Sequence, residues 1–141
     1  MQNRYLIQSF GDNAENTKKG VGTLIQLCDS NSVNGLILVP MKKNFKSSML
    51  NQVFSKEQLN ILDKNGALKT PKGNSIELCS MNTYKNHNKN PIVLGLWASK
   101  NIIEMVENEM YCNTIIVVPW IESDTTEWIK NTKPTVIANK T

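Results

Sequence analysis

The hydrophobic residues of the chain form short uninterrupted runs, separated by stretches with helical spacing or by polar loops. Residues 36–40 (LILVP) and 115–119 (IIVVP) both have the pattern of a buried strand that ends at Val-Pro. A helix-like stretch precedes each of them, and another apolar run precedes that stretch, at 5–7 and 92–94. Runs that are apolar on both faces are typical of parallel strands covered by helices on both sides. The pattern therefore predicts two β-α-β units, at about 4–40 and 91–119.

Each unit has its own helix pattern. In the first, residues 4–10 predict a strand, residues 11–17 a polar loop, and the helix is expected from Lys18 onward. Its inward face has the spacing i, i+3, i+4 and i+7, at Val21, Leu24, Ile25 and Cys28. In the second unit we expect Ser99 to cap a helix with Ile102, Ile103, Val106 and Met110 inward and Glu104, Glu107 and Asn108 outward.

The segment between the units predicts a helix and a hairpin. Ser55 and Gln58 match a capping box, and Asn65-Gly66 is a good helix stop. A turn at residues 70–73, with Pro71 at its second position and Gly73 at its fourth, separates the runs 67–69 and 75–80. This pattern predicts the hairpin. Residues 82–90 are polar and Asn-rich, which favours a loop that links the two units. After the second unit, residues 124–127 match another capping box, and residues 134–137 predict a last short strand.

Together these elements predict one α/β domain over residues 1–141, since 141 residues is an ordinary size for a single domain. The expected architecture is a Rossmann-like three-layer sandwich with a mostly parallel sheet and an inserted β-hairpin. No apolar run reaches the roughly 18 residues that a membrane helix requires, and no signal-peptide pattern is recognised. We therefore expect a soluble cytoplasmic protein with no membrane partner.

The charge of the chain is basic, with a net charge of +4. Fifteen of the sixteen basic residues are Lys and only Arg4 is Arg, so bidentate recognition of base edges is nearly excluded. Nineteen Asn residues accompany the lysines, which is typical of compositional bias in an AT-rich source. A specific nucleic-acid partner is therefore not expected. The weaker interpretation is non-specific nucleic-acid binding through Lys42, Lys43 and Lys46.

Polar and aromatic residues follow directly after the predicted strands. In open parallel sheets, ligands bind outside the carboxyl ends of the strands, so these residues are the candidate ligand site. They are Asp12, Lys42, Lys43, Trp97, Ser99, Lys100, Trp120 and Glu122. Ser99 and Lys100 open a helix, where free backbone N–H groups suit a phosphate. Trp97 and Trp120 could clamp a planar ligand if their strands are neighbours, but a packed aromatic lid or a dimer patch explains them equally well.

Motifs that would fix a reaction are absent. Gly20-Val21-Gly22 lacks the third glycine of a dinucleotide fingerprint, and no Walker or GxSxG motif occurs. The single His87 lies in the Asn-rich segment, and the three cysteines are too far apart for metal-ligand spacing. Asp12 and Glu122 could act as an acid–base pair across a crevice, or serve as a turn residue and a helix-dipole partner. No metal site, catalytic set or cofactor motif is predicted, and catalysis is left open.

The leading hypothesis is a domain that binds a nucleotide or another phosphorylated small molecule at the carboxyl edge. Trp97 and Trp120 would stack on the ligand, Ser99 and Lys100 would hold phosphate, and Lys42 and Lys43 would add positive field. The alternative is a non-catalytic interaction module that forms a homodimer through an exposed Trp surface.

Overall fold

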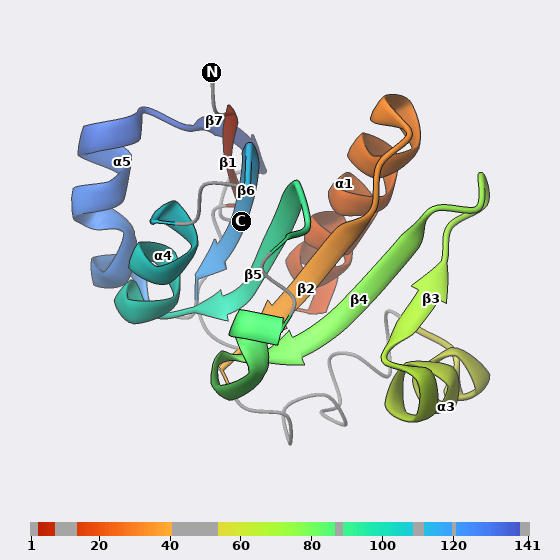
Figure 1. Ribbon diagram of the computed structural model, residues 1–141. Helices are drawn as coiled ribbons and strands as arrows, with labels where there is room; N and C mark the ends of the chain where they lie inside the picture. Colours follow the sequence, from red (N-terminus) through yellow and green to blue (C-terminus); the bar gives the residue numbers. More distant parts are fainter. Residues whose placement is uncertain are drawn as a thin grey trace.

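Seven strands form one sheet in the computed structural model of the chain (Figure 1). The structure describes residues 3–7, 14–40, 54–86, 89–108, 112–119 and 121–138, without the side chains of residues 14, 63, 65, 122 and 138. The strands are β1 Asn3–Ile7, β2 Gly35–Val39, β3 Ala67–Lys69, β4 Ser75–Ser80, β5 Ile92–Ala98, β6 Thr114–Pro119 and β7 Thr135–Ala138. Their order in the sheet is β3-β4-β2-β5-β6-β1-β7. Six strands are parallel, and the edge strand β3 is antiparallel to β4.

Helices cover both faces of the sheet. The α-helices are α1 Ala14–Asn31, α3 Lys56–Asn65, α4 Lys100–Glu107 and α5 Thr126–Thr132, and the 3-10 helices are η2 Met81–Asn86 and η3 Glu122–Thr125. The prediction of an α/β fold with a mostly parallel sheet is confirmed. None of the helices in the described part of the chain combines the length and the apolar character needed to cross a membrane.

The direction of each crossover decides which face its helix covers. The connections from β1 to β2 and from β2 to β4 run toward the β3 edge, and their helices α1 and α3 contribute to the same core cluster. The connections from β4 to β5, β5 to β6 and β6 to β7 run toward the β7 edge, and η2, α4 and α5 contribute to the cluster on the other face. Crossovers of a single hand require this division, because reversing the direction moves the helix to the opposite face.

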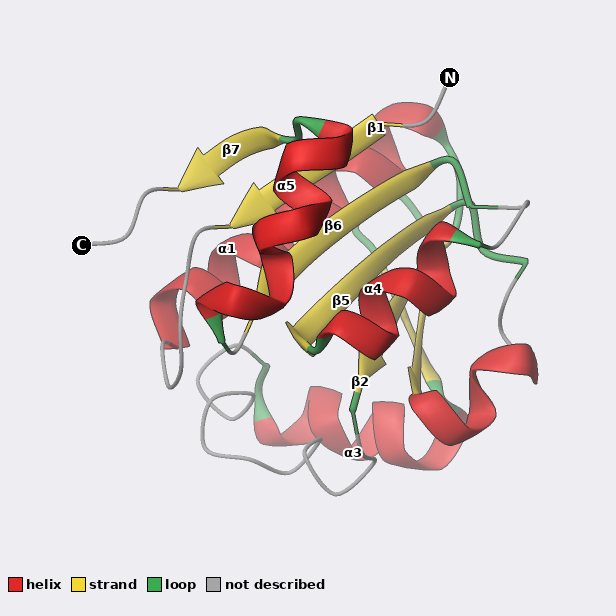
Figure 2. Cartoon of the chain, turned by 90° about the vertical axis from the view of Figure 1, so that its left-hand side faces the viewer, coloured by secondary structure: helices red, strands yellow, loops and turns green. Residues whose placement is uncertain are grey.

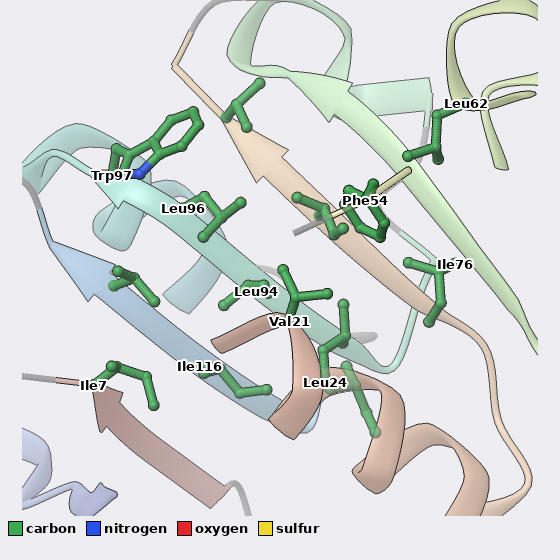
Figure 3. Close-up of a cluster of buried hydrophobic side chains, with 14 of the residues drawn as sticks. Ile7, Val21, Leu24, Phe54, Leu62, Ile76, Leu94, Leu96, Trp97 and Ile116 are labelled. Atoms are coloured by element: carbon green, nitrogen blue, oxygen red, sulfur yellow. The ribbon is translucent and has the colours of Figure 1, made fainter. Parts of the chain in front are cut away.

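The central strands are buried on both faces, as their sequences predict. Every residue of β2, β5 and β6 is buried, including the two runs that precede the Val-Pro endings. Alternate residues of β2 point to opposite clusters: Ile37 and Val39 pack toward α1 and α3, and Leu36 and Leu38 toward α4. Figure 3 shows Leu94 and Leu96 of β5 and Ile116 of β6 facing Val21 and Leu24 of α1.

The helix α1 begins earlier than predicted and packs very closely on the sheet. It starts at Ala14, so residues 14–17 are helical rather than part of a loop. Gly20 therefore lies inside the helix, where a Cβ atom would be 2.7 Å from Cγ2 of Val118. On β2, a Cβ atom at Gly35 would be 2.6 Å from Sγ of Cys28. Both glycines permit the close approach of helix and sheet, whereas Gly22 is exposed and has open space around it.

Helix ends agree with local sequence signals in two cases and differ in one. The Ser55 side chain accepts from Gln58 N–H at 3.1 Å and the Gln58 side chain accepts from Ser55 N–H at 2.9 Å, which is the predicted capping box. Gly66 ends α3 in the left-handed conformation with φ 72°. The second predicted capping box, at residues 124–127, is wrong. Those residues continue η3 into α5, and the N-cap Thr125 makes no side-chain cap bond.

One residue predicted in a loop, Tyr84, is buried in the core, and one predicted to face outward, Glu107, is part-buried in a polar network. Residues 81–86 of the Asn-rich segment form η2 and bury Tyr84 against the α4 face of the sheet. Glu107 does not point outward from α4, since its carboxylate accepts from both Arg4 of β1 and Nε1 of Trp128 in α5. Neither contact follows from local spacing, because both partners are distant in sequence.

Candidate ligand site at the carboxyl edge of the sheet

The carboxyl edge contains a switch in connection direction. The chain leaves β2 toward the face that carries α1 and α3, and it leaves the neighbouring strand β5 toward the face that carries α4. The two connections therefore diverge from adjacent strand ends. In open α/β sheets, ligands bind outside the strand ends where neighbouring connections diverge in this way.

Trp97 lies at this switch in a strained backbone conformation. The register of β5 against β6 shifts between Leu96 and Ala98, and Trp97 has φ 53°. A bulky residue with positive φ is an outlier of the type that clusters at functional sites. The shift places Trp97 on the same face as Leu96, while Ala98 joins the opposite cluster. As a result the indole lies at the end of β5 (Figure 3), on the face of the sheet that carries α1.

The Trp97 indole connects β5 to the opening turns of α1. Its Nε1 donates to Oγ1 of Thr17 at 3.3 Å, and the two side chains are 6% and 1% exposed. The adjacent Asn16 is buried as well. The sequence gives no signal for these buried polar residues, because the polar composition of residues 11–17 is typical of a loop. An earlier helix start would have placed Thr17 on the Val21–Leu24 face.

Ser99 and Lys100 start α4 immediately after β5, as predicted. The Ser99 hydroxyl accepts from Ile102 N–H at 3.4 Å, a long N-cap bond, and Ser99 is half-buried. Lys100 is exposed, and its Nζ lies 3.4 Å from a carboxylate oxygen of Glu127 in α5. An exposed pair of this kind contributes little to stability, so an anion could displace Glu127 from Lys100 at small cost.

The other predicted site residues are placed less fully. Glu122 is the first residue of η3, which follows β6, and its side chain lies outside the described structure. Asp12, Lys42, Lys43 and Trp120 also lie outside the described residues, as do Lys46 and His87. The strands that precede Trp97 and Trp120 are neighbours, which is the condition set for a clamp. Trp97, however, is buried and does not present an open ring face.

The three cysteines are buried and separate. Desolvation by burial raises the pKa of Cys28 to about 11, of Cys79 to about 12 and of Cys112 to about 11. Thiols of such high pKa are poor nucleophiles and poor metal ligands at neutral pH. Across the described residues, no three His, Cys, Asp or Glu side chains are grouped to hold a metal ion.

Comparison of the chain with protein-family models, with curated proteins and with solved structures gives no significant match. The functional argument therefore rests on the geometry of this chain alone.

Proposed function

We propose that the protein binds a nucleotide or another phosphorylated small molecule at the carboxyl edge of its sheet, next to the end of β5. The observation that carries the proposal is the meeting of two helix starts at one strand end. The opening turns of α1 contact β5 through the Trp97–Thr17 hydrogen bond, and α4 begins at Lys100, two residues after β5 ends. The two helices lie on opposite faces of the sheet.

Helix starts provide the electrostatics that a phosphate needs. The first backbone N–H groups of a helix have no intrahelical acceptor, and the helix dipole places partial positive charge there. Two such starts near one strand end both favour an anion there, and Lys100 contributes a full charge. Ser99 would donate its hydroxyl to a phosphate oxygen. The sequence assigns further positive field to Lys42 and Lys43, stacking to Trp120, and polar contacts to Asp12 and Glu122.

The proposed role of Trp97 is to position the site rather than to stack on the ligand. Its left-handed backbone sets the direction in which the chain enters Ser99 and α4, and its indole fixes the start of α1. In this proposal the fold is a Rossmann-like domain, and the antiparallel pair β3–β4 is an insertion at the edge of the sheet away from β7.

A ligand panel tests the proposal, with ADP, GDP, NAD and pyrophosphate as probes. Tryptophan fluorescence and thermal unfolding are followed during each titration. We expect at least one probe to change the fluorescence and raise the unfolding temperature. Absence of both effects for every probe contradicts the proposal.

The chain supplies a matched control for the phosphate contact. Ser55-Lys56 opens α3 with the same Ser-Lys pair as Ser99-Lys100, but the described strand that precedes it, β2, ends at Val39. We expect Lys100→Ala to weaken binding of the active probe roughly fivefold, the effect of one exposed charge contact of about 1 kcal/mol. Lys56→Ala should leave the affinity unchanged. Equal losses in both variants would show that only general charge matters.

A second candidate function is self-association as a homodimer, favoured by the edge strand β7. Val136 and Ile137 of β7 are 45% and 42% exposed, and β7 pairs with β1 on one side only within the described residues. Exposed apolar edge strands tend to pair with another chain. Size-exclusion chromatography of the protein and of a Val136→Lys variant separates the cases. A dimer that the substitution dissociates favours this candidate.

A further inference from the structure

Figure 2 shows α4 and α5 on the face of the sheet opposite α1. Residues of both helices line a groove. Its volume is about 610 Å³, within the range of ligand-binding clefts. The α4 wall is one helical stripe with the spacing i, i+3, i+4, i+7 and i+8, at Lys100, Ile103, Glu104, Glu107 and Asn108. Neighbouring helices usually meet through apolar stripes. This stripe is mostly polar, so the two helices leave an open groove between them.

An ion-pair network fixes the inner end of the groove. Glu107 of α4 accepts from both Nε and Nη2 of Arg4 in β1, and its Oε2 also accepts from Nε1 of Trp128 in α5 at 2.6 Å. Trp128 itself is 6% exposed. One carboxylate therefore joins β1, α4 and α5. These polar contacts hold α4 and α5 at a fixed separation and leave the groove between them open. Glu107 is therefore already occupied and does not serve as a ligand.

Other carboxylates of the groove are available. Glu104 is exposed and Asp124 is half-exposed, and neither side chain has a hydrogen-bond or ion-pair partner within the described structure. Glu127 has Lys100 as its partner, in an exposed pair of the kind that contributes little. The apolar contribution to the lining comes from Ile103 and the Trp128 ring.

The lining of the groove is net acidic although the chain is basic. It contains the acidic residues Glu104, Glu107, Asp124 and Glu127 and the basic residues Lys100 and Lys130. Six of the 12 acidic residues but only two of the 16 basic residues lie between Lys100 and Thr132. That segment therefore has a formal charge of −4, and the rest of the chain has +8. The local field of an acidic lining favours a cationic partner over an anionic one.

We infer that the groove between α4 and α5 is a docking site for a lysine- or arginine-bearing segment of another protein. A helix of eight residues is about 12 Å long, so the groove can hold several residues of an extended chain. Alternate side chains of an extended segment lie on one side, about 7 Å apart, and can reach successive carboxylates. Their ammonium or guanidinium groups would pair with Glu104 and Asp124, and their aliphatic stems would lie along Ile103 and Trp128.

The inference does not rest on ligand binding at the carboxyl edge, although Lys100 borders both places. Synthetic peptides test it. The probe is a blocked hexapeptide of alternating lysine and alanine, and the control peptide replaces each lysine with glutamate. Binding is measured by calorimetry and by the NMR shift of the Trp128 indole N–H. We expect the lysine peptide to bind and to shift this signal, with affinity falling as salt rises. Absence of binding, or equal binding of the glutamate peptide, overturns the inference.

Variants and a small cation complete the test. Glu104→Gln combined with Asp124→Asn should lower the affinity for the lysine peptide about tenfold, since two charge pairs are lost. Glu15→Gln combined with Glu57→Gln removes two exposed acids of α1 and α3 and should leave the affinity unchanged. Equal losses in both double variants contradict the groove as the site. Spermidine that binds as tightly as the peptide contradicts a protein segment as the occupant.

Discussion

The units β1–α1–β2 and β5–α4–β6 contain the same order of elements but differ in how their helices are used. The helix α1 has 18 residues and crosses two intervening strands, since β5 and β6 lie between β1 and β2. The helix α4 has eight residues and joins two adjacent strands. Gly20 brings α1 into close contact with β6, whereas one side of α4 faces an open groove lined by charged residues.

This difference indicates that β1–α1–β2 mainly stabilises the fold, whereas β5–α4–β6 also exposes residues that can bind a partner or ligand. A helix that crosses two strands must lie flat on both, so beyond Asn16 and Thr17 in its opening turns the buried stripe of α1 is apolar. A helix between adjacent strands needs only a narrow apolar face, which Ile102 and Val106 supply. Its other faces can then carry Ser99 and Lys100 at the carboxyl edge and Glu104 in the groove. We therefore expect substitutions on the buried face of α1 to act mainly on stability, and substitutions at the exposed positions of α4 to act mainly on binding.

The largest effect is expected in the buried face of α1. Leu24 is fully buried, so Leu24→Ala should lower the free energy of unfolding by about 3–4 kcal/mol through lost burial and a cavity. Ile25, half-buried on the same helix, is the control and should cost about 1–2 kcal/mol when changed to Ala. Urea denaturation measures both. A loss below about 1 kcal/mol for Leu24→Ala would contradict the structural role of α1.

The next effect tests the polar network under α4. Glu107→Ala leaves the largely buried Arg4 guanidinium without this carboxylate and removes the acceptor of Trp128 Nε1. We expect a loss of about 2–3 kcal/mol in the free energy of unfolding. Glu107→Gln keeps an acceptor oxygen and should cost less. A neutral result for Glu107→Ala would show that the network does not hold α4 and α5 in place.

Two glycines of α1 sharpen the contrast between its faces. Gly20→Ala puts a methyl group against Val118 and should lower the free energy of unfolding by about 1 kcal/mol, despite the better helix propensity of Ala. Gly22→Ala meets open space on the exposed face and should raise it by about 0.5–1 kcal/mol. Opposite signs in thermal or urea unfolding support the close packing of α1. Equal signs contradict it.

The loss of stability at high pH tests how deeply one thiol of each unit is buried. Cys28 lies in α1 and Cys112 precedes β6, and burial raises the pKa of each to about 11 from 9.0. The folded protein therefore holds these protons more tightly than the unfolded chain. The resulting stability is complete below pH 9 and is lost as the pH rises through about 11, by roughly 1 kcal/mol per thiol near pH 10.

Unfolding measured from pH 8 upward tests this statement, with Cys28→Ala and Cys112→Ala as the variants. Each variant should lose less stability than the unmodified protein between pH 9 and 11. Parallel pH profiles for all three proteins would show that neither thiol is buried as described.

Local signals in the sequence predicted much of the fold, and long-range contacts explain what they missed. The apolar runs of β2, β5 and β6 identify buried parallel strands, and the caps at Ser55 and Ser99 depend only on nearby residues. Strand order depends on contacts far apart in sequence, so the crossing of α1 over two strands could not be predicted. The failed capping box at 124–127 had a suitable sequence, but its first two residues belong to η3 and its last two to α5.

The sequence predicted where along the chain the candidate site lies, but it did not predict which side chains contact one another there. Residues after β5 follow from the rule that ligands bind at strand ends, and Ser99 and Lys100 lie there. The register shift that turns Trp97 to the face of α1 has no local signal, and neither does its hydrogen bond to Thr17. Glu107 appeared outward from helical spacing alone, because Arg4 and Trp128 reach it from other elements.

One NMR titration tests the central claim that the carboxyl edge beside β5 is the ligand site. The chain has three tryptophans, so the indole N–H of Trp97 reports on this edge and that of Trp128 on the groove between α4 and α5. With the nucleotide selected by the ligand panel, we predict shifts of the Trp97 indole and of the backbone amides of Ser99 and Lys100, while Trp128 stays unchanged. Unchanged signals at Trp97 and Ser99, with shifts confined to Trp128, would contradict the account.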